Sequence, residues 1–169
     1  MTMRRVAIHE RIRQLAVVVA TAAMSFAMLS GSAGASTPTH GSGIFAFTAA
    51  PTVTSTRTAD GNTITETTAP GVLGGALSGA FSLRQRTVTH ANGETNSRGL
   101  VTCVCTIGGN SGTIQIRFEG TGSGTGATAT LDGQFVLQNG TAGLSDLHGQ
   151  GTFSAIGTGG TYTVNYHFD

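Results

Sequence analysis

Two cysteines separated by one residue, Cys103 and Cys105, are the residues whose type and spacing most suggest chemistry. In an extended strand, residues two apart face the same side, with Cα atoms roughly 6.5 Å apart, near the upper limit for a disulfide. The pair could form a disulfide assisted by a β-bulge, two packed thiols, or a redox or soft-metal pair. Two thiolates supply only half of a zinc coordination shell. The sequence leaves these three interpretations open.

The histidines are scattered and show no metal-binding spacing. There is no H-x-H or H-E-x-x-H pattern; His148 is expected to lie in a glycine-rich loop, and His167 is expected to point outward from the last strand. Metal sites need convergent ligands, so we expect solvated or loop-bonded histidines, with no metal and no cofactor. The residues considered are His40, His90, His148 and His167.

Catalytic residues cannot be assigned from the sequence. Glu66 and Glu119 could act as acid or base only if they faced the interior, where burial would raise the carboxyl pKa. The alternation predicts that Glu119 points outward, and the direction of Glu66 is ambiguous. No G-x-S-x-G motif occurs, and the glycine-rich segment 120–126 lacks the lysine and the helix of a phosphate-binding loop.

The N-terminus resembles a secretory signal. An apolar run over residues 15–29 leads to small residues and an Ala33-Gly34-Ala35 sequence that fits cleavage before Ser36. The run of 15 residues is shorter than the roughly 20 that span a membrane, so we expect a cleaved signal over 1–35 and no stable membrane anchor afterwards. The alternative is an uncleaved anchor. Four arginines precede the run: Arg4, Arg5, Arg11 and Arg13.

The remaining 134 residues, 36–169, have the size of one domain. They contain five arginines, no lysine and seven acidic residues, which gives a net charge of −2 with histidine neutral. A nucleic-acid-binding domain would show a strong basic excess, so this class of partner is excluded.

Apolar and polar residues alternate along several segments, as expected of half-buried strands. In 113–119 the inward set is Ile114, Ile116 and Phe118, and in 161–168 it includes Tyr162, Val164 and Tyr166. The same pattern runs through 77–83, 100–107 and 131–138.

Turn residues separate the alternating segments. Asp60-Gly61 and Asn92-Gly93 are favoured two-residue hairpin turns. We expect 108–112 and 120–126 to be glycine-rich loops, and 142–147 to form at most one helical turn. The resulting eight or nine strands with short connections predict an all-β sandwich or barrel. The length of the strands and their internal glycines, Gly79, Gly99 and Gly133, favour a single antiparallel barrel.

Residues 140–153, with the pattern G-x-x-G-L-x-x-L-x-G-x-G-x-F, and the ending G-T-Y-x-x-x-Y-x-F at 160–168 resemble a bacterial domain family of unknown function. Residues 108–112 and 43–47 resemble its hairpin and its first strand. The family has the allene oxide cyclase-like, or dirigent-like, barrel fold. The resemblance implies an eight-stranded barrel with a small internal cavity, and it transfers no catalytic residue.

Three functions fit such a barrel. The first is a non-enzymatic module that binds a small apolar ligand or is purely structural. The second is a cyclase or isomerase that confines a hydrophobic substrate, with Tyr162, Tyr166 or Glu66 in the cavity. The third is a homo-oligomeric interaction protein, which an exposed apolar patch would favour. The cavity candidates are Phe81, Leu83, Cys103, Ile116, Phe118, Phe135, Tyr162, Val164 and Tyr166.

The sequence predicts both the processing and the oxidation state of the mature protein. Protein purified from culture supernatant should have an intact mass that begins at Ser36, because the signal is removed during export. If the cysteines are bridged, the mass should fall about 2 Da below that of the reduced chain. An uncleaved chain in the membrane fraction would support the anchor instead.

Overall fold

The computed structural model describes residues 37–169, so the expected signal segment lies outside the described residues. These residues form one antiparallel sheet of nine strands with two short 3-10 helices, and the described part contains no helix long and apolar enough to cross a membrane. The strands are β1 (Thr39–Phe47), β2 (Thr52–Ala59), β3 (Asn62–Gly75), β4 (Leu77–Thr89), β5 (Glu94–Ile107), β6 (Asn110–Ser123), β7 (Thr130–Gln138), β8 (Leu147–Ile156) and β9 (Gly159–Phe168).

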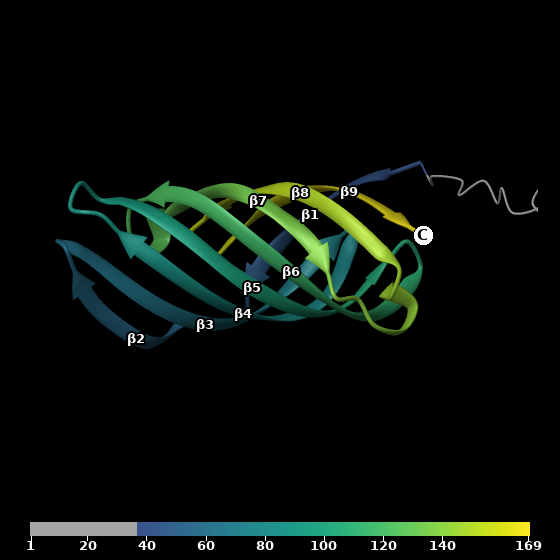
Figure 1. Ribbon diagram of the computed structural model, residues 1–169, viewed down its shortest axis with the longest axis horizontal. Helices are drawn as coiled ribbons and strands as arrows, with labels where there is room; N and C mark the ends of the chain where they lie inside the picture. The colour runs from purple at the N-terminus through teal and green to yellow at the C-terminus, as the bar shows by residue number, and fades with distance from the viewer. Residues whose placement is uncertain (1–36) are drawn as a thin grey trace, which may run out of the picture. The chain divides into compact units, whose positions relative to one another are not determined.

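The sheet closes into the expected eight-stranded barrel (Figure 1). Each strand from β3 to β9 pairs with the next, β9 pairs with β1, and β1 pairs with the second half of β3. The ninth strand, β2, pairs only with the first half of β3 and lies outside the closed ring. Residues 52–58 of β2 are exposed on both faces, so β2 is an edge strand that extends one end of the barrel.

Both sequence-based turn predictions are correct in position, although only one has the expected length, and two loop predictions are wrong. Asp60-Gly61 is a two-residue turn in which both residues have the positive φ angles that tight hairpins need. Asn92-Gly93 lies in a four-residue connection, 90–93, in which only Gly93 has a positive φ angle. The expected loop 108–112 is only the two-residue turn Gly108-Gly109, and most of 120–126 belongs to β6, which continues to Ser123. The single helical turn expected at 142–147 is the 3-10 helix Ala142–Leu144.

The extra length of β6 follows from how its glycines are used. Gly120 pairs with Gly133 of β7 and Gly122 pairs with Leu131, so both continue the ladder. A Cβ atom at Gly122 would collide with the carbonyl oxygen of Thr130. The glycines therefore permit close strand approach in a coiled sheet, which a sequence pattern cannot distinguish from a loop.

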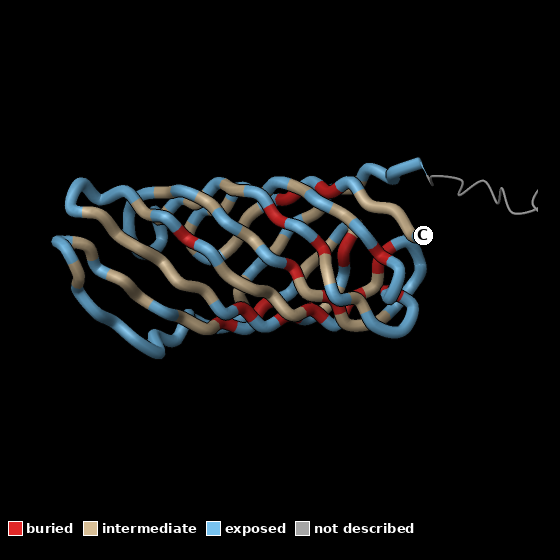
Figure 2. Tube along the Cα trace, viewed as in Figure 1, coloured by how far each residue is buried: buried red, intermediate tan, exposed pale blue. Residues whose placement is uncertain are grey.

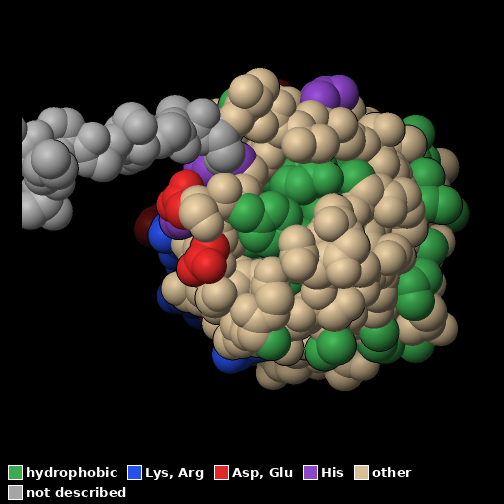
Figure 3. Space-filling view, turned by 90° about the vertical axis from the view of Figure 1, so that its right-hand side faces the viewer, with side chains coloured by type: hydrophobic (Ala, Val, Ile, Leu, Met, Phe, Trp, Pro, Cys, Tyr) green, Lys and Arg blue, Asp and Glu red, His purple; other side chains and the backbone are tan. Residues whose placement is uncertain are grey.

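The barrel has two different halves. Figure 2 shows buried residues concentrated in the middle and right-hand part, where the ends of β5, β7 and β9 lie. Side chains fill this half, and the apolar residues with the least exposure lie here: Leu77, Cys103, Ile107, Ile114, Leu144, Leu147 and Val164. Figure 3 looks onto this end, where hydrophobic side chains lie in the middle and acidic side chains lie on one side, next to histidine side chains.

Tyr162 fixes the corner between β3 and β4 against β9. Its hydroxyl accepts a hydrogen bond from the backbone N–H of Leu77 at 2.8 Å. It can donate its own proton to the carbonyl oxygen of Leu77 at 3.0 Å or of Gly74 at 3.1 Å. Burial raises the pKa of Tyr162 above its usual 10.0, an effect opposed by the hydrogen bond from Leu77.

Replacing Tyr162→Phe should lower the free energy of unfolding by about 1–3 kcal/mol, because the buried N–H of Leu77 loses its partner. Urea unfolding followed by circular dichroism would measure it. Tyr166→Phe is the matched control, since the Tyr166 hydroxyl makes no hydrogen bond within residues 37–169. The stability difference between wild type and Tyr162→Phe should shrink between pH 8 and pH 11. The raised pKa means that the unfolded phenol ionises first, so alkaline pH favours unfolding of the wild type. A pH-independent difference would contradict this role of Tyr162.

Candidate functional site

A cavity of about 840 Å³ occupies the other half of the barrel, which lies on the left in Figure 1. Its floor includes Leu77 and Tyr162, the residues that meet at the β3–β4 corner. Its lining also includes loop residues from 124–129 and 157–158, which connect β6 to β7 and β8 to β9. The cavity therefore opens at the end of the barrel that carries these loops.

Aromatic rings form one wall of the cavity through a series of edge-to-face contacts. The ring centroids are 6.1 Å apart for Phe81 and Phe47, 6.4 Å for Phe47 and Phe45, 6.5 Å for Phe45 and Phe153, and 5.7 Å for Phe153 and Phe118. The series joins four strands, β4, β1, β8 and β6. Edge-to-face packing is a favoured geometry for aromatic pairs, so each ring helps to hold the next in place.

The structure divides the nine predicted cavity residues into two groups. Those that line the cavity are Phe81, Leu83, Ile116, Phe118, Phe135 and Tyr162. The other three, Cys103, Val164 and Tyr166, belong to the packed half of the barrel and do not line the cavity. Both groups face the interior of the barrel, but they lie at different positions along its axis. The alternation of residues in a strand predicts the face of a side chain and not its position along the axis.

The sequence analysis missed two parts of the lining. Phe45, Phe47 and Phe153 alternate with exposed residues as the other inward aromatics do, so the same signal could have identified them. The polar part could not have been found in this way, because threonine and serine alternate with other polar residues there. Its members on β3, β4 and β5 are Thr65, Thr67, Gln85, Thr87, Thr89, Thr95 and Ser97.

Cys103 and Cys105 are joined by a disulfide within β5. Their Cα atoms are 5.4 Å apart, closer than in a flat strand and within the range of disulfides. The β4–β5 pairing continues past both residues without the bulge considered from sequence. Instead, β5 approaches β4 so closely that a Cβ atom at Gly79, opposite Cys105, would collide with the carbonyl oxygen of Val104.

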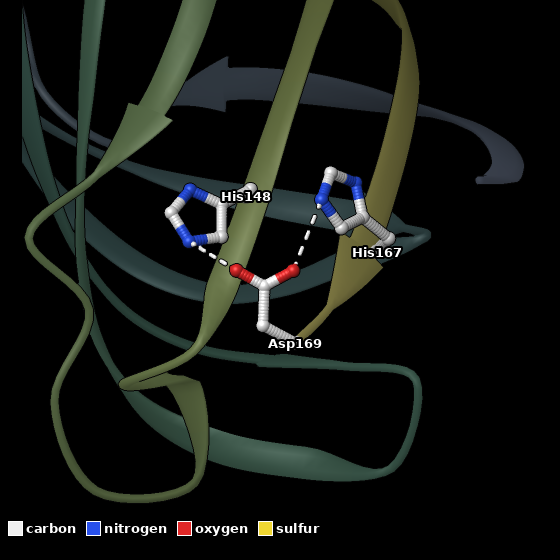
Figure 4. Close-up of polar contacts among 3 residues, drawn as sticks. All are labelled: His148, His167 and Asp169. Carbon is white, nitrogen blue, oxygen red and sulfur yellow. Dashed lines mark ion pairs between the residues drawn. The ribbon is translucent and has the colours of Figure 1, made fainter. Parts of the chain in front are cut away.

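His148 and His167 lie directly opposite each other on β8 and β9, contrary to the placement of His148 in a loop. Their rings stack with centroids 5.6 Å apart, and both face the carboxylate of Asp169 (Figure 4). The Nε2 atoms lie 3.2 Å and 3.4 Å from its two oxygens. The His148 and Asp169 side chains are 58% and 67% exposed, so solvent weakens the ion pair. No group of three or more His, Cys, Asp or Glu in 37–169 has an arrangement that could hold a metal ion.

The other two histidines have side-chain amide partners outside the barrel interior. His40 Nδ1 is 2.9 Å from Asn165 Oδ1. His90 lies between two asparagines, with Nδ1 2.9 Å from Asn62 Oδ1 and Nε2 2.7 Å from Asn96 Nδ2. The two His90 contacts hold the hairpin between β4 and β5 against the start of β3.

The carboxylates considered as acids or bases lie on the outer surface. Glu119 accepts a hydrogen bond from Gln134 Nε2 at 2.8 Å, and it points outward as predicted. Glu66 is exposed and lies opposite Arg86 across β3 and β4. A shallow depression of about 710 Å³ on this outer side is lined by side chains of both charges, among them Arg98 and Asp132. Neither carboxylate lines the internal cavity.

An exposed apolar row crosses the outside of the barrel at the seam between β1 and β3. Ala46 on β1 lies opposite Val72 on β3, which lies opposite Ala80 on β4, and Ala80 lies opposite Val104 on β5. Ile44 lies two residues from Ala46 on β1. Ile44 is 62% exposed, Val72 43% and Val104 68%. The apolar row consists of Ala46, Val72, Ala80, Val104 and Ile44.

The fold and the cavity define the class of protein: a closed eight-stranded antiparallel barrel, packed in one half and hollow in the other. A protein-family profile matches residues 41–169, nearly the whole described chain. The chain belongs to this family, DUF3224, which is described as a protein family of unknown function. The resemblance found in the sequence to a domain family of unknown function with a barrel fold is confirmed.

Comparison with solved structures gives the same fold. A DUF3224 protein of unknown function from Shewanella oneidensis MR-1 superposes with a TM-score of 0.59 at 15% sequence identity. The match covers 78% of this chain and 98% of the other chain. No curated protein matches the sequence. The comparisons therefore establish family and fold, and the site geometry must support any functional proposal.

Proposed function

We propose that this protein is an exported barrel that binds a small, largely apolar ligand in its internal cavity, without catalysing a reaction on it. The observation that carries the proposal is the contrast between the two halves of the barrel. One half is filled by side chains, whereas the other keeps an open cavity of about 840 Å³ beside the aromatic rings. Export is proposed from the N-terminal pattern.

The size and chemistry of the cavity fit small-molecule binding. Ligand pockets commonly measure about 300–1,000 Å³ and are lined mostly by apolar and aromatic side chains, with a few polar groups. Here Phe45, Phe118 and Phe153 supply the aromatic surface, and most of the polar side chains lie on β3, β4 and β5. The cavity is preformed, so a ligand would not have to open the packed half of the barrel.

The alternative function is a cyclase or isomerase that uses the same cavity. Of the three residues named for this role, Glu66 is outside and Tyr166 lies in the packed half, so only Tyr162 lines the cavity. Its hydroxyl is held by the backbone of Leu77 and Gly74, and burial raises the pKa of Tyr162. A phenol held in this way is poorly suited to accept a proton, and this supports binding over catalysis.

Filling the cavity should prevent binding of an apolar probe. N-phenyl-1-naphthylamine, a neutral dye that fluoresces strongly in apolar surroundings, should bind the protein purified from culture supernatant saturably at a one-to-one ratio. Val101 lies between Leu83 and Ile116 on the inward face, so Val101→Phe should raise the dissociation constant about tenfold, or about 1.4 kcal/mol.

The control for this experiment is Val136→Phe, which adds the same volume on the outward face of β7. It should leave dye binding unchanged. Equal loss in both variants would indicate a general effect on the fold. A wild-type protein that gives no saturable signal would refute ligand binding in the cavity.

The exposed apolar row favours a second candidate function, assembly with further copies of the same chain. The neighbours of the row are uncharged: Ile44 pairs with Thr161, and Val104 pairs with Thr113. An apolar face with an uncharged border fits an equally uncharged partner, and a second copy provides one. Exposed apolar patches of this kind commonly mark interaction sites.

If copies associate through the apolar row, Val104→Glu should convert an oligomer into a monomer, because the interface would bury an unpaired charge. Size-exclusion chromatography with light scattering would measure the molar mass. Val136→Glu, which introduces the same charge outside the row, should leave the oligomer intact. A monomeric wild type at high protein concentration would remove this candidate.

A further inference from the structure

The cavity lining contains no aspartate, glutamate, lysine, arginine or histidine. Tyr162 is its one titratable side chain, and that hydroxyl is engaged at the floor. A charged group placed inside would lose its hydration and find no opposite charge, which is strongly unfavourable. The lining is nevertheless not uniformly apolar, so it does not resemble a simple hydrocarbon pocket.

On β3, β4 and β5, the polar and apolar residues of the lining are separated along the barrel. On β4, the inward residues are Leu77, Phe81 and Leu83 towards the floor, and Gln85, Thr87 and Thr89 towards the opening. The inward residues of β3 and β5 change in the same direction, from Leu73 to Thr67 and Thr65 and from Val101 to Ser97 and Thr95. The apolar part of β4, from Leu77 to Leu83, covers roughly 20 Å of strand before strand tilt shortens it. A ligand that follows this separation has an apolar body and one polar end.

Three of the polar side chains form a connected group, here called the polar cluster: Gln85, Thr87 and Ser97. Gln85 Nε2 donates to Thr87 Oγ1 at 2.8 Å and to Ser97 Oγ at 3.2 Å. The two hydroxyls are 2.8 Å apart, so one donates to the other. Ser97 is only 5% exposed and is the one polar residue in 37–169 classed with the buried core.

The hydrogen bonds inside the polar cluster leave two groups unused. The Gln85 amide N–H groups are both engaged, whereas its carbonyl oxygen Oε1 has no partner within residues 37–169. Of the two hydroxyl protons, one lies between Thr87 and Ser97 and the other remains available. The cluster can therefore offer one acceptor and one donor to a ligand.

We propose that the ligand is an uncharged amphiphile, with its apolar body against the aromatic rings and its hydroxyl, or a similar neutral group, on the polar cluster. This inference rests on the proposed function and specifies the class of ligand. A hydroxyl donates one hydrogen bond and accepts others, which matches the two unused groups. A carboxylate can only accept and would face the Gln85 carbonyl oxygen without a cation. An ammonium can only donate and would be buried without an anion.

Three ligands that share one apolar chain and differ in their polar end can test the proposal. 1-Decanol, decanoate and decylammonium would compete with N-phenyl-1-naphthylamine for the protein purified from culture supernatant at pH 8, where the acid and the amine are both charged. Decanol should displace the dye at concentrations at least about tenfold lower than either charged ligand. If decanoate or decylammonium competes as well as decanol, the preference for an uncharged ligand is refuted, although the cavity remains a binding site.

Two variants test the role of the polar cluster itself. Gln85→Leu keeps the size of the side chain and removes the unused acceptor, so decanol should bind about five- to tenfold more weakly while the dye binds as before. Gln150→Leu makes the same change on the exposed face of β8 and should alter neither. Circular dichroism would verify that both variants fold. Unchanged decanol affinity in Gln85→Leu would refute contact between the ligand and the polar cluster. Absence of saturable dye binding to the wild type would refute the proposed function itself.

Discussion

The barrel depends on a steric constraint between glycines and aromatic rings that face each other across neighbouring strands. Six inward-facing glycines each lie opposite an aromatic residue, and a Cβ atom at any of these glycines would collide with the facing ring. The pairs are Gly43–Tyr162, Gly71–Phe81, Gly99–Phe118, Gly133–Phe153, Gly151–Phe135 and Gly160–Phe45. Each ring occupies the space above the glycine backbone, which the Cβ atom of any other residue would fill. Glycine also lets the strands bend enough to close a narrow barrel.

This constraint explains how the interior can be both rigid and hollow. The paired rings lie close to the backbone of the facing glycines, and several of them contact each other edge to face around the wall. Space at the barrel axis therefore remains in the half where the aromatic pairs dominate. In the other half, aliphatic side chains and the Cys103–Cys105 disulfide point to the axis and fill it. Tyr162 lies at the boundary, where its hydroxyl joins the floor of the cavity to the β3–β4 corner.

Charge is distributed in a way that separates the inside from the outside. Arg86, Arg98 and Glu119 face outward on adjacent strands, and His148, His167 and Asp169 meet at one end of the barrel. The cavity contains none of these groups and instead has a small polar cluster near its opening. A site of this kind is suited to orient a ligand through a neutral group and offers little for proton transfer. The functional argument therefore depends as much on which groups are kept out of the cavity as on those that line it.

The features that the sequence determined by itself are local. The period-two pattern of Ile114, Ile116 and Phe118 assigned both the strand and its inward face, and Asp60-Gly61 assigned a hairpin, because neighbouring residues decide these properties. The family motifs over 140–153 and 160–168 added the barrel fold. Gly120 and Gly122 were wrongly assigned to a loop, because glycine serves turns and close strand contacts equally well.

Only the tertiary structure decided which inward residues line a cavity and which fill a core. Phe118 and Val164 have the same local pattern, and their positions along the barrel axis separate them. The inward direction of Thr87 and Ser97 depends on the register between β4 and β5, since a polar strand gives no alternation to read. The meeting of His148 with His167, and the exclusion of β2 from the closed ring, likewise depend on strand pairing between distant parts of the chain. Such pairings are set by the shape of the whole barrel, which no short segment of sequence contains.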